Sequence, residues 1–142
     1  MYILPITLTI ASAAALVNFW LALRITRTRA ASKTWMGDGD DPALIARMRA
    51  HANFTEYTPI ILILIGAIEL ARGTTTWLWI VGAVYILGRL AHGLGMDGGR
   101  LVRLRSVGAV STMLILIGLA VYAITIPYLG ISPVVTNVAS IG

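Results

Sequence analysis

Residues 2–23, YILPITLTIASAAALVNFWLAL, contain no charged side chain. A helix of about 20 apolar residues is long enough to cross the roughly 30 Å hydrocarbon layer of a bilayer. The stretch therefore predicts a membrane-spanning helix. A cleaved signal peptide is the alternative, but its basic residues should precede the apolar run. Here they follow it, beginning at Arg24.

The composition of the whole chain also favours a membrane protein. Of its 142 residues, 58% are hydrophobic and only 12% are charged, whereas a soluble domain carries about 25% charged residues. The net charge of +5 would suggest a nucleic-acid partner in a soluble chain. In so apolar a chain the basic residues need another explanation, and we expect no nucleic acid to be bound.

Two residue types limit the possible chemistry. The chain has no cysteine, which excludes a disulfide framework, a thiolate metal site and a cysteine nucleophile. Its two histidines and six acidic residues are too few and too scattered for the common zinc motifs. We therefore predict no metal site, and any sulfur chemistry must come from a ligand.

Three further apolar stretches follow the first, separated by loops. The segment 33–42 is rich in glycine and aspartate and predicts a loop, in which Asp41 caps a helix that begins with Pro42. Because backbone polar groups in lipid must be satisfied within each helix, four spans predict an all-α, antiparallel four-helix membrane bundle. We expect a single domain over 1–142, with helices over about 2–28, 42–72, 76–95 and 104–127 and a loose or interface-lying tail over 128–142.

The basic residues predict the orientation of this bundle. Ten of the 11 lie in the first and third loops or in the adjoining helix ends, and only Arg72 lies on the other side. By the positive-inside rule the basic side faces the cytoplasm, which leaves both termini outside. The ten residues are Arg24, Arg27, Arg29, Lys33, Arg47, Arg49, Arg89, Arg100, Arg103 and Arg105.

Several polar residues enter segments that should lie in lipid. Arg49, Asn53 and Glu56 have the spacing i, i+4, i+7 and share one face of the second helix. On the third helix Arg89 and His92 are i, i+3 neighbours, and a charge as deep as that of Arg89 needs a partner inside the bundle. We expect Glu56 and Arg89 to pair, either as a structural ion pair or as part of a site.

These residues converge toward the cytoplasmic side, where Arg105 and Ser106 open the fourth helix. Such a site offers several cations, one carboxylate and amide groups. It suits a small, zwitterionic but net-anionic ligand whose charged parts stay near the interface and whose reactive end points toward lipid.

Two motifs resemble those of a known family. The stretch 49–59, RAHANFTEYTP, is similar to the R-A-H-x-N-x-x-E-x-x-P signature of MAPEG, the membrane-associated proteins in eicosanoid and glutathione metabolism. The stretch 88–92, GRLAH, followed by Arg105 and Ser106, gives a second match. With the four-span plan, the resemblance covers nearly the whole chain.

The resemblance implies a homotrimer in the inner membrane, with glutathione bound between neighbouring subunits at the cytoplasmic side. It implies that Arg105, aided by the hydroxyl of Ser106, activates the thiol, because a nearby guanidinium favours the thiolate. Glu56 would take the α-amine of the peptide and the arginines its carboxylates. The residues expected to bind glutathione are Arg24, Arg49, Asn53, Glu56, Arg89 and His92.

The chain departs from the family pattern at two positions. Some members carry an aromatic hydroxyl four residues after the histidine and another four residues after the catalytic arginine. Here these positions hold Met96 and Ala109, which removes two hydrogen-bond donors. The eicosanoid activities therefore do not transfer. We expect a detoxifying transferase or peroxidase that acts on lipophilic electrophiles.

Two alternatives remain open at this point. A small proton-coupled multidrug transporter also has four short spans, but its essential carboxylate should lie in the first span. Residues 2–23 have no acidic residue, and Asn18 is their most polar side chain. The other alternative is a MAPEG-like protein that binds a lipid or a thiol without catalysis, which the residues Met96 and Ala109 favour.

Overall fold

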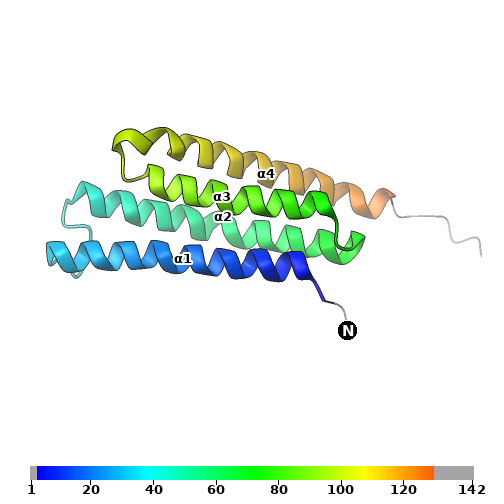
Figure 1. Ribbon diagram of the computed structural model, residues 1–142, viewed down its shortest axis with the longest axis horizontal. Helices are drawn as coiled ribbons and strands as arrows, with labels where there is room; N and C mark the ends of the chain where they lie inside the picture. Colours follow the sequence, from blue (N-terminus) through cyan, green and yellow to red (C-terminus); the bar gives the residue numbers. More distant parts are fainter. Residues whose placement is uncertain (1–2, 130–142) are drawn as a thin grey trace, which may run out of the picture.

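The structure is a computed structural model that describes residues 3–129. It contains four long helices and one short 3-10 turn, and no strand occurs within those residues (Figure 1). All four helices are long and apolar enough to cross a membrane, which confirms the predicted all-α, four-span architecture. The helices are α1 (Pro5–Ser32), α2 (Pro42–Arg72), α3 (Thr76–Gly95) and α4 (Val102–Leu129), and η1 (Gly99–Leu101) is the 3-10 turn.

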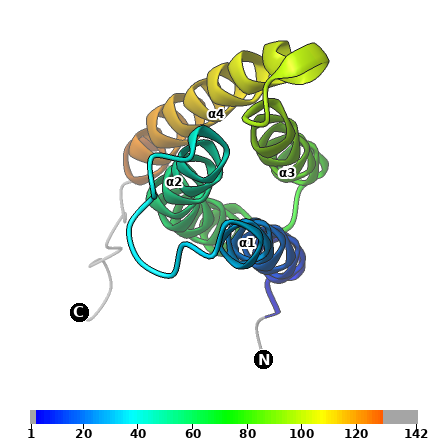
Figure 2. The same ribbon diagram turned by 90° about the vertical axis from the view of Figure 1, so that its left-hand side faces the viewer.

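Consecutive helices run antiparallel and surround a common core. α1 packs against α2 and α3, α4 packs against the same two helices, and α1 and α4 occupy opposite corners (Figure 2). The loops 33–41 and 96–98 lie at one end of the bundle, called the basic end below. The loop 73–75 and the two ends of the described chain lie at the other, called the terminal end (Figure 1).

Two helices differ in extent from the sequence-based expectation. α1 begins at Pro5, whose fixed φ suits the first helical position. It continues to Ser32, where Lys33 takes a left-handed conformation (φ 54°) and its N–H donates to the carbonyl of Arg29. α4 contains Pro127 and extends to Leu129. Residues 128 and 129 of the expected tail are therefore helical, and the rest of the tail lies outside the described residues.

The start of α2 agrees with the prediction from its sequence. The Asp41 carboxylate accepts a hydrogen bond from the Ala43 backbone N–H at 2.9 Å, and Pro42 is the first helical residue. The Asp41 side chain thus satisfies one of the N–H groups that a helix leaves free at its start.

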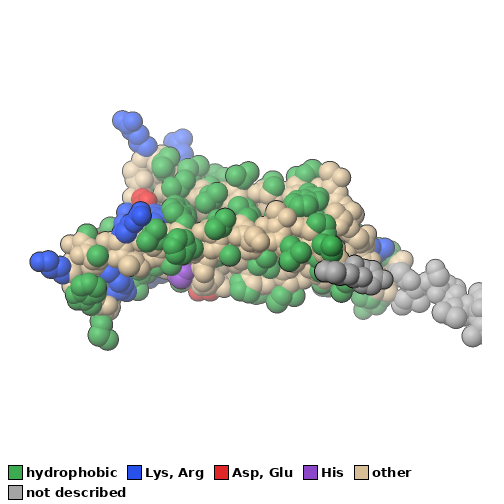
Figure 3. Space-filling model, turned by 60° about the horizontal axis from the view of Figure 1, so that its bottom comes forward, with side chains coloured by type: hydrophobic (Ala, Val, Ile, Leu, Met, Phe, Trp, Pro, Cys, Tyr) green, Lys and Arg blue, Asp and Glu red, His purple; other side chains and the backbone are tan. Residues whose placement is uncertain are grey.

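The apolar side chains divide between an inner core and an outer surface. A core cluster toward the terminal end includes Ile65, Leu78 and Tyr85, and a second cluster toward the basic end includes Val17 and Phe54. In the most apolar 18-residue stretch of α4, only 17% of the residues are buried in the single chain. On the face that Figure 3 shows, hydrophobic side chains are spread along the length of the bundle, and most of the Lys and Arg side chains lie at the basic end. This distribution suits a bundle whose sides face hydrocarbon.

α3 and α4 approach each other closely enough to place their backbones in contact. A Cβ atom on Gly95 would overlap the backbone of Arg105, and one on Gly108 would overlap the carbonyl of Gly88. Both glycines are therefore required by the contact between the helices. The contact holds the end of α3 against the first turns of α4.

At the terminal end, the Glu69 side chain of α2 caps α1. Its carboxylate accepts hydrogen bonds from the backbone N–H groups of Ile6 at 2.9 Å and Thr7 at 2.8 Å, and from the Thr7 hydroxyl at 2.7 Å. Leu4, at the N-cap position, offers no side-chain acceptor. The carboxylate thus turns inward to the free N–H groups of a neighbouring helix.

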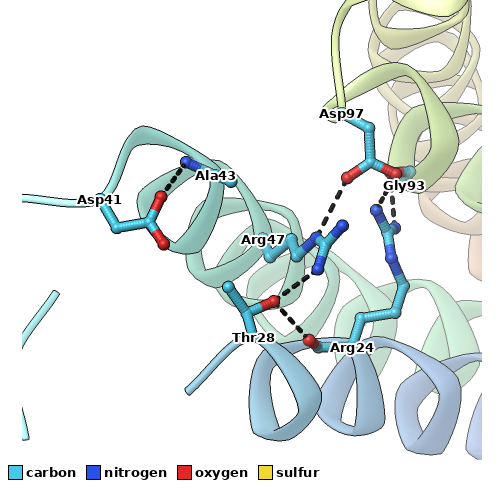
Figure 4. A network of polar contacts seen from close by, with 7 residues as sticks. All are labelled: Arg24, Thr28, Asp41, Ala43, Arg47, Gly93 and Asp97. Atoms are coloured by element: carbon cyan, nitrogen blue, oxygen red, sulfur yellow. Dashed lines mark hydrogen bonds and ion pairs between the residues drawn. The ribbon is translucent and has the colours of Figure 1, made fainter. Parts of the chain in front are cut away.

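At the basic end, Asp97 joins three elements. It forms ion pairs with Arg24 of α1 and Arg47 of α2 (Figure 4). Arg24 also donates to the carbonyl of Gly93 at 2.8 Å, and its guanidinium lies 4.7 Å from the ring centroid of Trp20. The loop after α3 is thereby attached to α1 and α2.

The cap on α1 gives a stability prediction. Glu69→Gln replaces an acceptor-only carboxylate, 2% exposed, by an amide with one oxygen and two donors. We expect it to lower the free energy of unfolding by about 1–3 kcal/mol, measured by thermal or chemical denaturation in detergent. The control Glu56→Gln changes a carboxylate on the same helix that is exposed in the single chain, and it should lower the free energy of unfolding much less. Equal effects of the two variants would contradict the capping role.

The Asp97 contacts give a second prediction. Asp97→Asn should lower the free energy of unfolding by about 1–2 kcal/mol, more than a typical surface pair contributes, because it leaves the nearly buried Arg24 without its counter-charge. The matched control is Asp40→Asn, an exposed loop residue with φ 55°, a conformation that asparagine tolerates. The prediction fails if the Asp97 variant is as stable as this control.

Candidate functional site

A polar hollow opens between α2 and α3 in the half of the bundle nearer the basic end. Its volume is about 270 Å³. Apart from Ala52 and Met96, every side chain that lines it is polar. The lining residues are Arg49, Ala52, Asn53, Glu56, His92 and Met96.

The α2 side of the hollow follows from helical spacing. Arg49, Asn53 and Glu56 lie along one side, as their i, i+4, i+7 spacing predicts, while Ala50 and Phe54 of the same turns are buried in the core. Arg49 and Glu56 are exposed in the single chain, and Asn53 is partly buried. A cation, an amide and a carboxylate are thus available side by side.

Arg89 lies behind this wall and does not pair with Glu56, so the expected Glu56–Arg89 pair is wrong. Its Nη2 donates to Asn53 Oδ1 at 2.8 Å, and its Nη1 donates to Thr112 Oγ1 at 3.2 Å. Glu56 follows Asn53 by three residues in α2. Relative to Asn53 it is rotated by about 60° around the helix and lies about 4.5 Å further along the helix axis. Its side chain is therefore on the surface while Arg89, 1% exposed, reaches the amide inside.

His92 connects the hollow to the start of α4. Its Nδ1 donates to the backbone carbonyl of Arg105 at 3.0 Å, which leaves Nε2 as an acceptor in the neutral ring. The close α3–α4 contact described above makes this bond possible. The side chains of Arg105 and Ser106 are exposed at the first turn of α4, and neither lines the hollow of the single chain.

Arg24 is the predicted site residue that the structure places elsewhere. Its guanidinium is bound to Gly93 and Asp97, and it is absent from the lining of the hollow. Arg24 thus supports the loop after α3 rather than the wall of the hollow. Of the other seven predicted residues, four line the hollow, Arg89 lies directly behind it, and Arg105 and Ser106 lie next to it along α4.

Sequence reasoning missed two polar contacts of this half of the bundle. One is at Asp97, whose only sequence signal is that it is the one acidic residue in a basic, glycine-rich loop. His51 Nε2 and Asn18 Oδ1 lie 2.9 Å apart between α2 and α1, so the His51 ring donates to the most polar side chain of the first span. Helical spacing explains why His51 lies on another face than Arg49, Asn53 and Glu56, but it does not specify the partner of His51.

The chemistry of the hollow is that of a site for a small charged organic ligand. Guanidinium and amide groups bind carboxylates, and a carboxylate binds an ammonium group. Among residues 3–129, no group of three or more His, Cys, Asp or Glu side chains could hold a metal ion. The arrangement can therefore bind and orient a zwitterion by hydrogen bonds and ion pairs.

Comparisons with known proteins agree with the two motifs. The profile of the MAPEG family matches residues 7–125, which cover most of the four helices and every residue that lines the hollow. Inner membrane protein YecN of Escherichia coli strain K12 is 34% identical over 99 residues, covering 69% of this chain and 74% of that protein. The protein of the same name from Escherichia coli O6:H1 gives the same values. The chain is thus a member of the MAPEG family of membrane proteins.

Proposed function

We propose that this chain is a glutathione transferase- or peroxidase-like enzyme of the inner membrane. The observation that carries the proposal is the meeting of Arg49, Asn53, Glu56 and His92 in one hollow, in a chain that belongs to MAPEG. In this proposal Glu56 accepts from the α-amine of glutathione, and Arg49 and Asn53 donate to a carboxylate. The proposal has the hollow face the cytoplasm, which the gathering of basic residues at the same end of the bundle supports by the positive-inside rule.

Arg105 and Ser106 supply the proposed thiol activation. A guanidinium and a hydroxyl near the sulfur stabilise the thiolate, which is the nucleophilic form. In conjugation, the thiol loses its proton, the sulfur forms a bond to the electrophilic carbon, and the leaving group departs with its bonding pair. In peroxide reduction, two glutathione thiols give a disulfide while the hydroperoxide gives an alcohol and water.

A homotrimer is part of the proposal. Glu56, Arg105 and Ser106 are exposed in the single chain, and a neighbouring copy would cover them and complete the binding site between subunits. The lipophilic substrate would enter from the bilayer along the apolar sides of the bundle. The exposed leucine, isoleucine and valine side chains of α4 support this route.

One structural feature favours the non-catalytic alternative. Met96 lines the hollow at a position where some relatives carry an aromatic hydroxyl, and a thioether donates no hydrogen bond. A protein with this hollow could retain a lipid or a thiol without activating it. The identity of the molecule bound to the purified protein therefore distinguishes the enzyme from the non-catalytic binding protein, whereas the fold is the same for both.

The first test is catalysis. Purified protein in detergent should conjugate a chloronitrobenzene acceptor at a rate that depends on glutathione, and Arg105→Ala should lower kcat/KM by at least about a hundredfold, as the loss of a transition-state donor does. Arg103→Ala, which removes an exposed arginine two residues earlier on α4, is the matched control and should retain activity. If the two variants lose activity equally, Arg105 has no special role.

The second test is native mass spectrometry of the purified protein. We expect three copies of the chain with bound glutathione, since the proposed site lies between subunits. A bound lipid or a different thiol, together with no turnover of any acceptor, would replace the enzyme by the non-catalytic alternative. A monomer that binds glutathione would contradict the proposed trimer alone.

A further inference from the structure

Arg89 carries a full charge inside the bundle with only neutral partners. Its hydrogen bonds go to the Asn53 amide and the Thr112 hydroxyl, and its guanidinium lies 5.6 Å from the ring centroid of Phe54. Its Nε atom is buried and has no hydrogen-bond partner. Within residues 3–129, the ion pairs involve only Arg24, Arg47 and Asp97, so no carboxylate there neutralises Arg89.

Such a charge is costly in an apolar bundle. Ionisable side chains within membrane spans usually face the interior, pair with one another and mark functional sites. Removing a buried charge often stabilises a fold when an apolar residue of similar size replaces it. Packing alone therefore does not explain an arginine that is 1% exposed and unneutralised.

Asn53 transmits the effect of Arg89 to the hollow. Its Oδ1 atom is occupied by Arg89, while its side chain also lines the hollow. Because Oδ1 already accepts from a guanidinium, the amide orientation is set and its two N–H groups are the part left to meet a ligand. Asn53 therefore presents donors to the hollow.

Arg89 also adds positive charge to the wall. Among the lining residues Arg49 and Glu56 carry opposite charges that cancel, and the neutral His92 ring described above adds none. The buried guanidinium of Arg89, which is bonded to the lining residue Asn53, therefore adds a positive charge that no lining residue cancels. A charge in a low-dielectric surrounding acts more strongly on a ligand than an exposed one does.

We infer that Arg89 is a positioning and specificity-determining residue that acts through Asn53. It leaves the Asn53 amide presenting only donors to the hollow and adds a buried positive charge behind them, which selects a ligand presenting an anionic acceptor such as a carboxylate of the thiol peptide. This inference rests on the proposed function, in which the ligand is glutathione.

The experiment compares two ligands that differ in charge. Calorimetry in detergent gives the Kd values of glutathione and of its dimethyl ester, in which both carboxylates are neutral. The wild-type protein should prefer glutathione. Arg89→Met should reduce this preference by at least about tenfold, whereas Arg89→Lys, which keeps the charge, should largely retain it. A variant that only destabilises the fold should weaken the binding of both ligands equally and leave the ratio of their Kd values unchanged.

Two further variants separate selectivity from folding. Thr112→Val removes the other hydrogen bond of Arg89 without touching the hollow, and it should lower the thermal midpoint while keeping the ligand preference. Asn53→Asp places a carboxylate against Arg89. It should keep the thermal midpoint and lose the preference, so it tests the inference even if Arg89→Met does not fold.

The outcomes distinguish this inference from the function on which it rests. No binding of glutathione by the wild-type protein overturns both. Binding of glutathione with an unchanged preference in Arg89→Met, or in Asn53→Asp if the former does not fold, overturns the role of Arg89 alone. Loss of the preference in these variants, with retention in Arg89→Lys and Thr112→Val, supports it.

Discussion

The structure depends on one constraint, which is that a polar group inside a membrane bundle must find its partner in the protein because lipid offers none. The backbone meets this constraint through four long helices. The polar side chains meet it through contacts between helices. Each of these contacts joins residues far apart in the sequence, and together they determine which helices lie side by side and which polar groups remain available to a ligand.

The two ends of the bundle meet the constraint in different ways. At the terminal end a single carboxylate, Glu69, is held by N–H and hydroxyl donors of α1 and so needs no cation. At the basic end the solvated acid Asp97 holds two arginines. Between them Arg89 is bound only by neutral groups. The bundle therefore pairs the charges of Arg24, Arg47 and Asp97, which supports the fold, and leaves the buried charge of Arg89 without a counter-ion behind the hollow.

The polar residues occur in the pattern of the MAPEG motifs, and the structure shows which of them line the hollow and which support the fold. Arg49, Asn53, Glu56 and His92 form the hollow, while Arg24, which the resemblance also placed in the site, is bound to the loop after α3. The tight α3–α4 contact at Gly95 and Gly108 brings His92 to the carbonyl of Arg105. The close packing of α3 and α4 thus places Arg105, the residue proposed to activate the thiol, next to the hollow.

By itself the sequence determined the number of spans, the Asp41 cap, the common face of Arg49, Asn53 and Glu56, and the family. These features depend on local composition, helical spacing and contiguous motifs, which need no knowledge of neighbours. Only the tertiary structure decided that Arg89 reaches Asn53 and Thr112, that Glu69 caps α1, and that Arg24 pairs with Asp97. The physical reason is that a long charged side chain in a bundle can satisfy itself with any polar group within reach. Which group is within reach depends on the rotation and depth of each helix against its neighbours.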